Sequence, residues 1–286
     1  YRVHAASASR TKQYMRIDDR MPWMRDLDYP MAAPATQAPR VRSYSRPRVS
    51  VIIPVGPGHE KWLADAIESL IGQTMREWEC IVIDDTEPLD LSIEDVLKHY
   101  PFVQYVCGRA TDAHPMGAGK ARNLGAQQAQ APFLVFLDAD DMLQPNALEI
   151  FLRAHIEAKG KYIYCDCNIL DEKGDLILRK AREYKQEVWS DNGIHSVTAL
   201  VPKVWFDDVG GFDTDLIGWE ESSLYTKLAV KGYCGIRVTL PLFVYREYSG
   251  TRRVISHQNK DSLIAILHER FEGVEMATSC CGGNAD

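Results

Sequence analysis

The chain has 286 residues, of which 45% are hydrophobic and 26% charged, and this composition indicates one sizeable α/β domain with extensions. Apolar runs such as APFLVFL are far shorter than the roughly 20 residues that a membrane span needs. The N-terminus also lacks the apolar core of a signal peptide, so we expect a cytoplasmic protein without a transmembrane segment.

The first 48 residues differ in charge from the rest. Residues 1–48 hold ten Lys and Arg against four Asp, whereas the whole chain carries a net charge of −7. They include YPMAAPATQAPRVRSYSRPR, which shows neither helical nor strand periodicity, so we predict a basic extended arm or linker. The arm either lies as a solvated tail against the acidic body or contacts a nucleic acid or another partner.

From residue 48 onward the sequence alternates between strand and helix patterns. Strand segments are apolar on both faces, which predicts a largely parallel sheet covered by helices on two sides. The expected strands are 48–55, 78–85, 102–108 and 132–138, and the expected helices are 60–73, 92–100, 117–130 and 146–158.

Ligands of such sheets bind beyond the carboxyl ends of the strands. That rule brings three strand ends to one crevice, and the residues there are Pro54, Val55, Asp84, Asp85, Asp138, Asp140 and Asp141. Carboxylate clusters bind hard cations such as Mg²⁺ or Mn²⁺, often together with substrate phosphates. We therefore expect a divalent cation completed by a nucleotide diphosphate, although Asp also favours helix N-termini and LDADD could simply cap the next helix.

The segment GAGKARNLG, residues 117–125, adds positive charge to the same crevice. Its glycines would let backbone amides approach an anion at a helix start, and Lys120 and Arg122 could reach phosphates or a base edge. The spacing fits neither of the common phosphate-binding glycine motifs, so both cations could also be solvated.

Taken together, VSVIIPV, ECIVIDDTE, GKARNLGAQQAQAPFLVFLDADD, VGGFDTDLIGWEESSLYTKLAVKGY and PLFVYREYSGTRR resemble the motifs of inverting family-2 glycosyltransferases. The resemblance runs from residue 49 to about residue 253. It implies a GT-A-like, Rossmann-type α/β fold with a mixed, mostly parallel sheet flanked by helices and with extended N- and C-terminal arms. It also divides the chain into a nucleotide-sugar half (49–145), an acceptor half (146–253), and a C-terminal helix with a flexible Cys/Gly tail (254–286).

The resemblance assigns roles on the donor side. It implies that a nucleotide-diphosphate sugar binds with Mn²⁺ or Mg²⁺ and that Asp140 is the main metal ligand. Asp138 would face the ribose or the metal, and Arg122 would lie near the base and phosphates. The nucleobase would be held by the end of the first strand, at Pro54 and Val55, and by Asp84 or Asp85.

The acidic pair that opens GWEESSLYTKLAVKGY carries the acceptor side of the resemblance. Glu221 stands at the position of the catalytic base, where the family more often has Asp, and Glu220 precedes it. The indole ring of Trp219 could stack on a sugar, or it could pack in the core. Alternatively, both glutamates are favourable first-turn acids of a helix.

Tyr248 departs from the family, because many relatives have there a His that helps to coordinate the metal. A phenol is a poor ligand for a hard cation, so the metal is held by Asp140, phosphates and water, binds weakly, or gains another ligand such as His257. Arg246, Arg252 and Arg253 are expected as diphosphate clamps or as solvated loop charges.

Some residues carry weaker signals. His195 could touch substrate, but an ordinary loop histidine is the simpler interpretation. Cys165 and Cys167 alternate along a strand and are expected in the core.

Three functions are open at this point. The chain could transfer a sugar to a glycan, lipid-linked or other hydroxyl acceptor, with inversion. It could be a catalytically weak nucleotide-sugar-binding or structural module, which Tyr248 and Glu221 would favour. It could also act on a nucleic-acid acceptor, which the basic arm would favour.

Overall fold

The computed structural model describes residues 46–86, 91–108, 116–184, 195–216, 218–248, 259–275 and 277. Most of the predicted basic arm lies outside these residues, as do Arg252, Arg253, His257 and the Cys/Gly tail. The predicted domain boundaries therefore stay predictions.

A nine-stranded sheet forms the centre of the described chain, in the order β3-β2-β1-β4-β8-β6-β9-β5, with β7 paired to β6. The four strands β3, β2, β1 and β4 pair in parallel, as the alternating pattern predicted. Their partners in the second half are mixed, because β4 pairs with β8 antiparallel and β6 pairs with β9 in parallel. The strands are β1 (Val49–Val55), β2 (Trp78–Asp84), β3 (Gln104–Cys107), β4 (Phe133–Phe136), β5 (Met142–Leu143), β6 (Tyr162–Leu170), β7 (Leu176–Arg179), β8 (Ala199–Pro202) and β9 (Gly235–Arg246).

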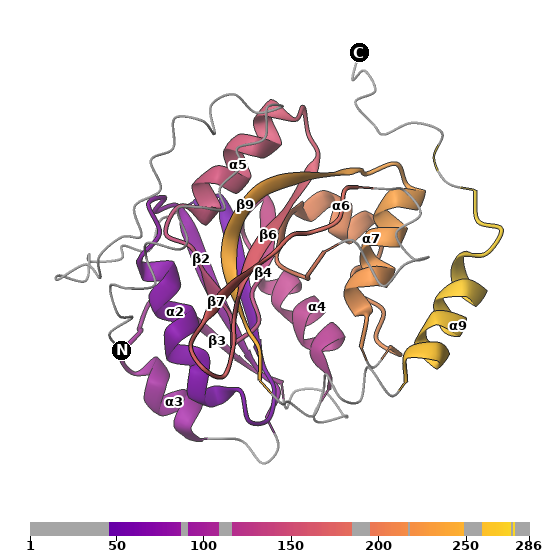
Figure 1. Cartoon of the computed structure of the whole chain (residues 1–286). Coiled ribbons are helices and arrows are strands. Elements are labelled where there is room, and N and C mark those ends of the chain that lie inside the picture. The colour runs from indigo at the N-terminus through magenta and orange to yellow at the C-terminus, as the bar shows by residue number, and fades with distance from the viewer. Residues whose placement is uncertain are drawn as a thin grey trace.

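Helices cover both faces of this sheet (Figure 1). Successive residues of β1 point to opposite faces, so Val51 and Ile53 join the core beneath α2 and α5, while Ile52 joins the core beneath α4 and α7. This explains why every residue of β1 is buried and why all but Ser50 are apolar. The helices are η2 (Glu60–Trp62), α2 (Leu63–Ile71), α3 (Leu91–Leu97), α4 (Ala118–Gln128), α5 (Ala147–Glu157), α6 (Lys203–Asp208), α7 (Glu220–Val230) and α9 (Lys260–Phe271).

The contact between α4 and the sheet depends on a glycine. A Cβ added at Gly125 would lie 2.4 Å from Cγ2 of Ile52, closer than side chains can approach. Gly125 therefore lets α4 pack directly on β1, and this places the N-terminus of α4 at the carboxyl ends of the strands. The predicted helix-flanked, mixed α/β sheet is confirmed.

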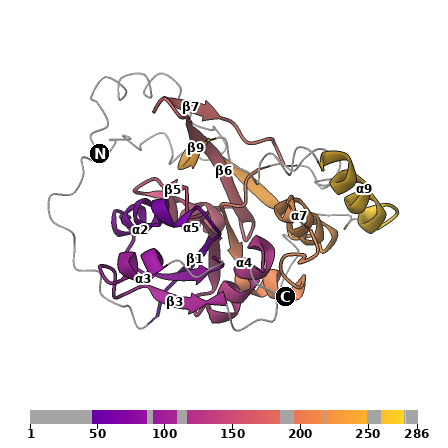
Figure 2. The ribbon, with the colours of Figure 1, turned by 90° about the horizontal axis from the view of Figure 1, so that it is seen from below.

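The last helix, α9, packs beside α7 (Figure 2). Leu263, Leu267 and Phe271 of α9 form a small core with Leu216. Arg270 adds an ion pair of 2.6 Å to Asp213, which in turn contacts Lys227 of α7 at 2.8 Å. The helix thus braces the loop that leads into α7. Among the described residues, no helix has both the length and the apolar character that a membrane span requires.

Candidate active site

The strand ends that the sequence analysis brings together lie side by side at the carboxyl ends of β1, β2 and β4. The backbone N–H of Asp85 donates to the carbonyl of Val55 across 2.9 Å, and that of Leu137 donates to Ile52 across 3.0 Å. These two bonds extend the pairing with β1 one residue beyond the ends of β2 and β4. The turn after β4 therefore opens next to the ends of β1 and β2.

Asp138, Asp140 and Asp141 form a compact cluster in that turn. Each offers a carboxylate oxygen, and these oxygens all lie within 4.8 Å of one another. The turn is closed by a bond from the N–H of Asp141 to the carbonyl of Asp138, 3.0 Å long. Asp141 is buried, whereas the side chains of Asp138 and Asp140 are 31% and 15% exposed. The two partly exposed carboxylates are those that a ligand can reach.

Crowding of like charges affects the acidity of this cluster. Burial, and then the charge of Asp138, raise the pKa of Asp140. Burial and the charges of Asp140 and Asp138 raise the pKa of Asp141 well above its ordinary value. A divalent cation would relieve this repulsion, and three hard oxygen donors are the ligands that Mg²⁺ and Mn²⁺ prefer. The residues therefore fit the predicted metal.

Arg122 supports the cluster from α4. Its Nη2 donates to Oδ1 of Asp138 at 2.6 Å, and the residue is only 3% exposed. Burial disfavours the charged guanidinium, but Asp138 and Glu220 outweigh that effect and raise the pKa of Arg122. Nε and Nη1 are buried as well and have no hydrogen-bond partner among the described residues, and the predicted contact of Arg122 with a base or phosphates stays a prediction. Lys120, two residues earlier, is exposed.

Arg246 braces the same turn from the end of β9. Its backbone N–H donates to Oδ1 of Asp141 and its Nε to the carbonyl of Asp140, both at 3.0 Å. Its Nη2 pairs with Asp65 of α2 at 2.8 Å. These three bonds give Arg246 a role in holding the turn, and the predicted clamp on a diphosphate stays a prediction.

Asp140 has two polar neighbours: Tyr248, whose position the sequence analysis associated with the metal, and His59, which it did not single out. The hydroxyl of Tyr248 donates to Oδ2 of Asp140 at 3.0 Å and lies 2.7 Å from Nε2 of His59. The ring of Trp62 lies 4.4 Å from that of Tyr248, between ring centroids. The signal was available for His59, because it follows the carboxyl end of β1, where ligands of parallel sheets bind.

The aspartates at the end of β2 are engaged within the protein. Asp85 accepts hydrogen bonds from the backbone N–H groups of Met116 and Gly117, at 2.6 and 2.9 Å. Asp84 accepts from the N–H and hydroxyl of Thr86 and from the hydroxyl of Tyr105. Both carboxylates are buried, and the bonds of Asp85 fix the entry into α4. A contact between either carboxylate and a nucleobase stays a prediction.

The side chains at the end of β1 are also turned away from solvent. Pro54 and Val55 are buried in the sheet. Any contact that they make with a nucleotide would therefore involve their backbone or the residues that follow them.

The acidic pair of the acceptor half lies at the N-terminus of α7. Glu220 is 3% exposed and packs on α4, where a Cβ at Gly119 would lie 3.6 Å from its Cγ. Glu221 is half-buried. Trp219 has a left-handed backbone, with φ of 59°, and its side chain packs against the small core of α9. The structure therefore gives Trp219 a core contact, and stacking on a sugar stays a prediction.

His195 sits in an aromatic cluster with Tyr164 and Tyr225. Its ring stacks on Tyr164 at 4.1 Å and contacts Tyr225 at 4.2 Å. Burial lowers the pKa of His195 to about 3, so the imidazole is neutral at neutral pH. This supports the packing interpretation. Cys165 and Cys167 are buried free thiols, as expected.

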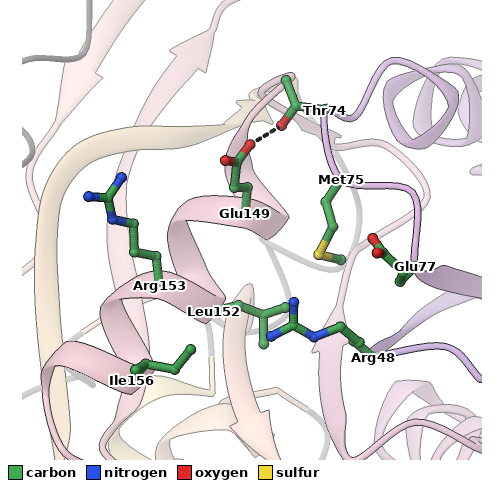
Figure 3. Close-up of a pocket in the computed structure, with 8 residues that line it drawn as sticks. All are labelled: Arg48, Thr74, Met75, Glu77, Glu149, Leu152, Arg153 and Ile156. Atoms are coloured by element: carbon green, nitrogen blue, oxygen red, sulfur yellow. Dashed lines mark hydrogen bonds between the residues drawn. The ribbon is translucent and has the colours of Figure 1, made fainter.

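A pocket lies at the opposite end of the strands (Figure 3). Arg48 and Glu77 line it from just before β1 and β2, and Thr74 donates to Glu149 of α5 at 2.6 Å. Its apolar lining residues are Met75, Leu152 and Ile156. Its place at the amino ends of β1 and β2 separates it from the aspartate cluster.

Comparison with known proteins decides the family. The family model described as glycosyl transferase family 2 matches residues 50–211. This chain belongs to glycosyl transferase family 2. The match includes both aspartate-bearing strand ends and stops before α7, so the family assignment does not depend on Glu221.

Relatives agree with this assignment. An uncharacterized glycosyltransferase of Rickettsia typhi is 27% identical over 197 residues, covering 63% of this chain and 58% of that protein. The O-antigen biosynthesis protein RfbC of Myxococcus xanthus is 26% identical over 236 residues, covering 78% of this chain and 18% of that protein. The chain thus spans only part of the length of these relatives.

Solved structures show the same fold. The structure of S. aureus TarS 1-349 in complex with UDP-GlcNAc has a TM-score of 0.63 and 16% identity, and it covers 80% of this chain and 68% of that chain. The structure of S. aureus TarS has a TM-score of 0.63 and 17% identity, with 80% of this chain and 40% of that chain covered. At this identity the likeness is evidence for the fold, and the predicted GT-A-like architecture is confirmed.

Proposed function

We propose that this chain transfers a sugar from a nucleotide-diphosphate sugar to an acceptor hydroxyl, with inversion at the anomeric carbon. The observation that carries the proposal is the cluster of Asp138, Asp140 and Asp141 in a family-2 glycosyltransferase chain, in the turn that follows the carboxyl end of β4. The TarS complex with UDP-GlcNAc supports a nucleotide sugar as the class of donor.

Asp138 and Asp140 would hold the cation, Mn²⁺ or Mg²⁺, because they are the partly exposed members of the cluster. When bound, such a cation neutralises charge on the departing nucleoside diphosphate. Arg122 holds Asp138 in place, and Arg246 holds the backbone of Asp140. The protein thus supplies a carboxylate pair whose positions are fixed before the donor arrives.

Glu221 would act as the general base. It would take the proton of the acceptor hydroxyl while that oxygen bonds to the anomeric carbon and the bond from this carbon to the diphosphate oxygen breaks. Attack from the face opposite the leaving group gives inversion. Two features support Glu221 over Glu220: it is the more exposed of the two, and Glu220 is packed on α4.

Donor turnover without an acceptor tests the proposal. The chain is incubated with Mn²⁺ and a panel of nucleotide sugars, and released nucleoside diphosphate is measured. We expect slow hydrolysis of at least one donor, loss of this hydrolysis with EDTA and its recovery with added Mn²⁺. Asp140→Asn should abolish it, whereas Asp95→Asn, on the exposed surface of α3, should not.

The opposite results separate the alternatives. Binding of a donor without any turnover would identify a binding module, and absence of both would overturn the proposal. The configuration of the released sugar, read by NMR immediately after release, tests inversion. Cation-independent hydrolysis would remove the metal from the proposal and leave the transferase.

A further inference from the structure

The hydroxyl of Tyr248 lies between His59 and Asp140. It is 2.7 Å from Nε2 of His59 and 3.0 Å from Oδ2 of Asp140. Nε2 of His59 itself is 3.8 Å from the same carboxylate oxygen. The contact joins the segment between β1 and α2 to the residues after β9, which are 189 positions apart in the sequence.

The chemistry of the three groups sets the direction of the bonds. A carboxylate can only accept a hydrogen bond, and a phenol has a single proton. The hydroxyl of Tyr248 therefore donates its single proton to Asp140, and it accepts from His59 when Nε2 of that ring carries a proton. Nδ1 of the same ring lies 3.3 Å from the carbonyl of Gly56. In this series His59 orients the hydroxyl, and the hydroxyl orients the carboxylate.

Aromatic packing holds the series in place. The ring of Trp62 lies 4.4 Å from the ring of Tyr248 and 6.1 Å from that of His59, measured between ring centroids. The ammonium of Lys61 and the guanidinium of Arg246 lie over the Trp62 ring, at 4.1 and 5.5 Å. The ring of Tyr248 thus keeps its position without the hydroxyl, so the hydroxyl can be removed alone.

We propose that His59 and Tyr248 are positioning residues that fix the Asp140 carboxylate for the divalent cation. The inference rests on the cation of the proposed function and adds two residues to it. Hydrogen-bonded partners behind a ligand restrict its orientation, and losing such a partner typically lowers metal affinity by about 10- to 100-fold. A neighbouring phenol and imidazole need not touch the cation for this effect.

Direct measurement of Mn²⁺ binding tests the inference. The Kd is obtained from the EPR signal of free Mn²⁺, with the full chain, first with Mn²⁺ alone and then with UDP added. We expect Tyr248→Phe and His59→Ala each to raise the Kd by about 10-fold or more. His59→Gln should recover part of the affinity, because its amide N–H can still donate to the hydroxyl of Tyr248.

Tyr100→Phe is the matched control. It removes a phenol hydroxyl that donates to a carboxylate, Glu68, at 2.7 Å on the surface between α2 and α3. It should leave the Kd for Mn²⁺ unchanged. Thermal unfolding of each variant shows whether a change in Kd reflects a change in folding.

The outcomes distinguish two failures. If the wild-type chain binds Mn²⁺ and the Tyr248 and His59 variants bind it equally well or more tightly, this inference is overturned while the proposed function stands. If the wild-type chain binds no Mn²⁺, the cation of the proposed function and this inference both fall.

Discussion

Arg122 donates through Nη2 to Oδ1 of Asp138 across 2.6 Å, and this ion pair ties α4 to the turn after β4. The guanidinium is almost fully buried, whereas the carboxylate is 31% exposed. The positive charge of Arg122 is thus buried beside a carboxylate that is partly open to solvent. The pair explains how a turn with three acidic side chains keeps its shape before any cation binds.

The energetic coupling of this pair can be measured with a double-mutant cycle. Arg122→Met, Asp138→Asn and the double variant are compared by urea unfolding. We expect a coupling free energy of about 1 to 3 kcal/mol, the range for hydrogen bonds to charged groups and for residues in contact. The exposed pair of Lys98 and Asp95 on α3 is the control cycle, and its coupling free energy should be clearly smaller because solvent screens the two charges. Equal coupling free energies for the two pairs would contradict the inference that the buried Arg122 holds Asp138 in place.

Asp140→Asn should stabilise the fold in the absence of a cation and weaken cation binding. Because the folded chain raises the pKa of Asp140, ionisation of this group destabilises the fold as pH rises through and above its ordinary value of 3.8. In EDTA at pH 7 the variant should therefore unfold at a higher urea concentration than the wild type. This difference should disappear below that ordinary value, where the carboxyl is protonated in both states.

The affinity of the same variant for Mn²⁺ should fall by more than about 100-fold, since a ligand is lost and not only its support. Asp95→Asn, an exposed carboxylate on α3, is the control for both measurements. The opposite result, a variant less stable than the wild type in EDTA at pH 7, would contradict this prediction. It would show that the hydrogen bonds to the Asp140 carboxylate outweigh the destabilisation by burial and by the charge of Asp138.

The parallel half of the fold could be predicted from the sequence because β1, β2 and β4 are buried at nearly every position and are mostly apolar. Asp138 and Asp140 were found for the same reason, since strand ends and ligands coincide. The partners of these residues were harder to predict. Tyr248 meets His59 across 189 positions, and no local pattern encodes such a contact.

Burial decides which of the predicted residues a ligand can reach. Asp84 and Asp85 looked like ligand-binding residues in the sequence, yet both are buried and bonded within the protein. Trp219 is similar, because it packs against Leu216 and α9, and α9 begins 41 positions later in the sequence. Sequence periodicity indicates which face is apolar, but it does not show which polar group finds a partner.

Asp85→Ala should destabilise the fold. The substitution leaves the N–H groups of Met116 and Gly117 without their acceptor at the entry into α4, and an unsatisfied buried donor costs about 1 to 3 kcal/mol. Urea unfolding at neutral pH measures this loss. Asp95→Ala, at an exposed position, should change stability by less than about 0.5 kcal/mol.

Asp85→Asn separates the structural role from the predicted contact with the nucleobase. The amide oxygen still accepts a hydrogen bond, so most of the stability should be kept. If the Kd for UDP rises several-fold while stability stays near that of the wild type, the contact with the base gains support. If UDP binds Asp85→Asn as it binds the wild type, the carboxylate serves the α4 entry alone.

The last prediction concerns Glu221, which distinguishes a transferase from a module that only binds donor. Glu221→Gln keeps the size of the side chain and its place in the first turn of α7, but it cannot take a proton. Loss of a general base typically costs about 10² to 10⁴ in rate. We expect Glu221→Gln to bind UDP and Mn²⁺ as the wild type does and to lose transfer to the acceptor by this factor, measured as initial rates at saturating donor.

Glu220→Gln is the matched comparison, one residue earlier on the same turn. Because Glu220 is 3% exposed and packs on Gly119, its substitution should act on folding stability, with a loss of transfer smaller than tenfold. Equal losses in rate at both positions would indicate that the pair shapes the start of α7 and that neither is the base. If Glu220→Gln alone abolished transfer, the base would be the buried glutamate, and a movement of α7 away from α4 would have to expose it during turnover.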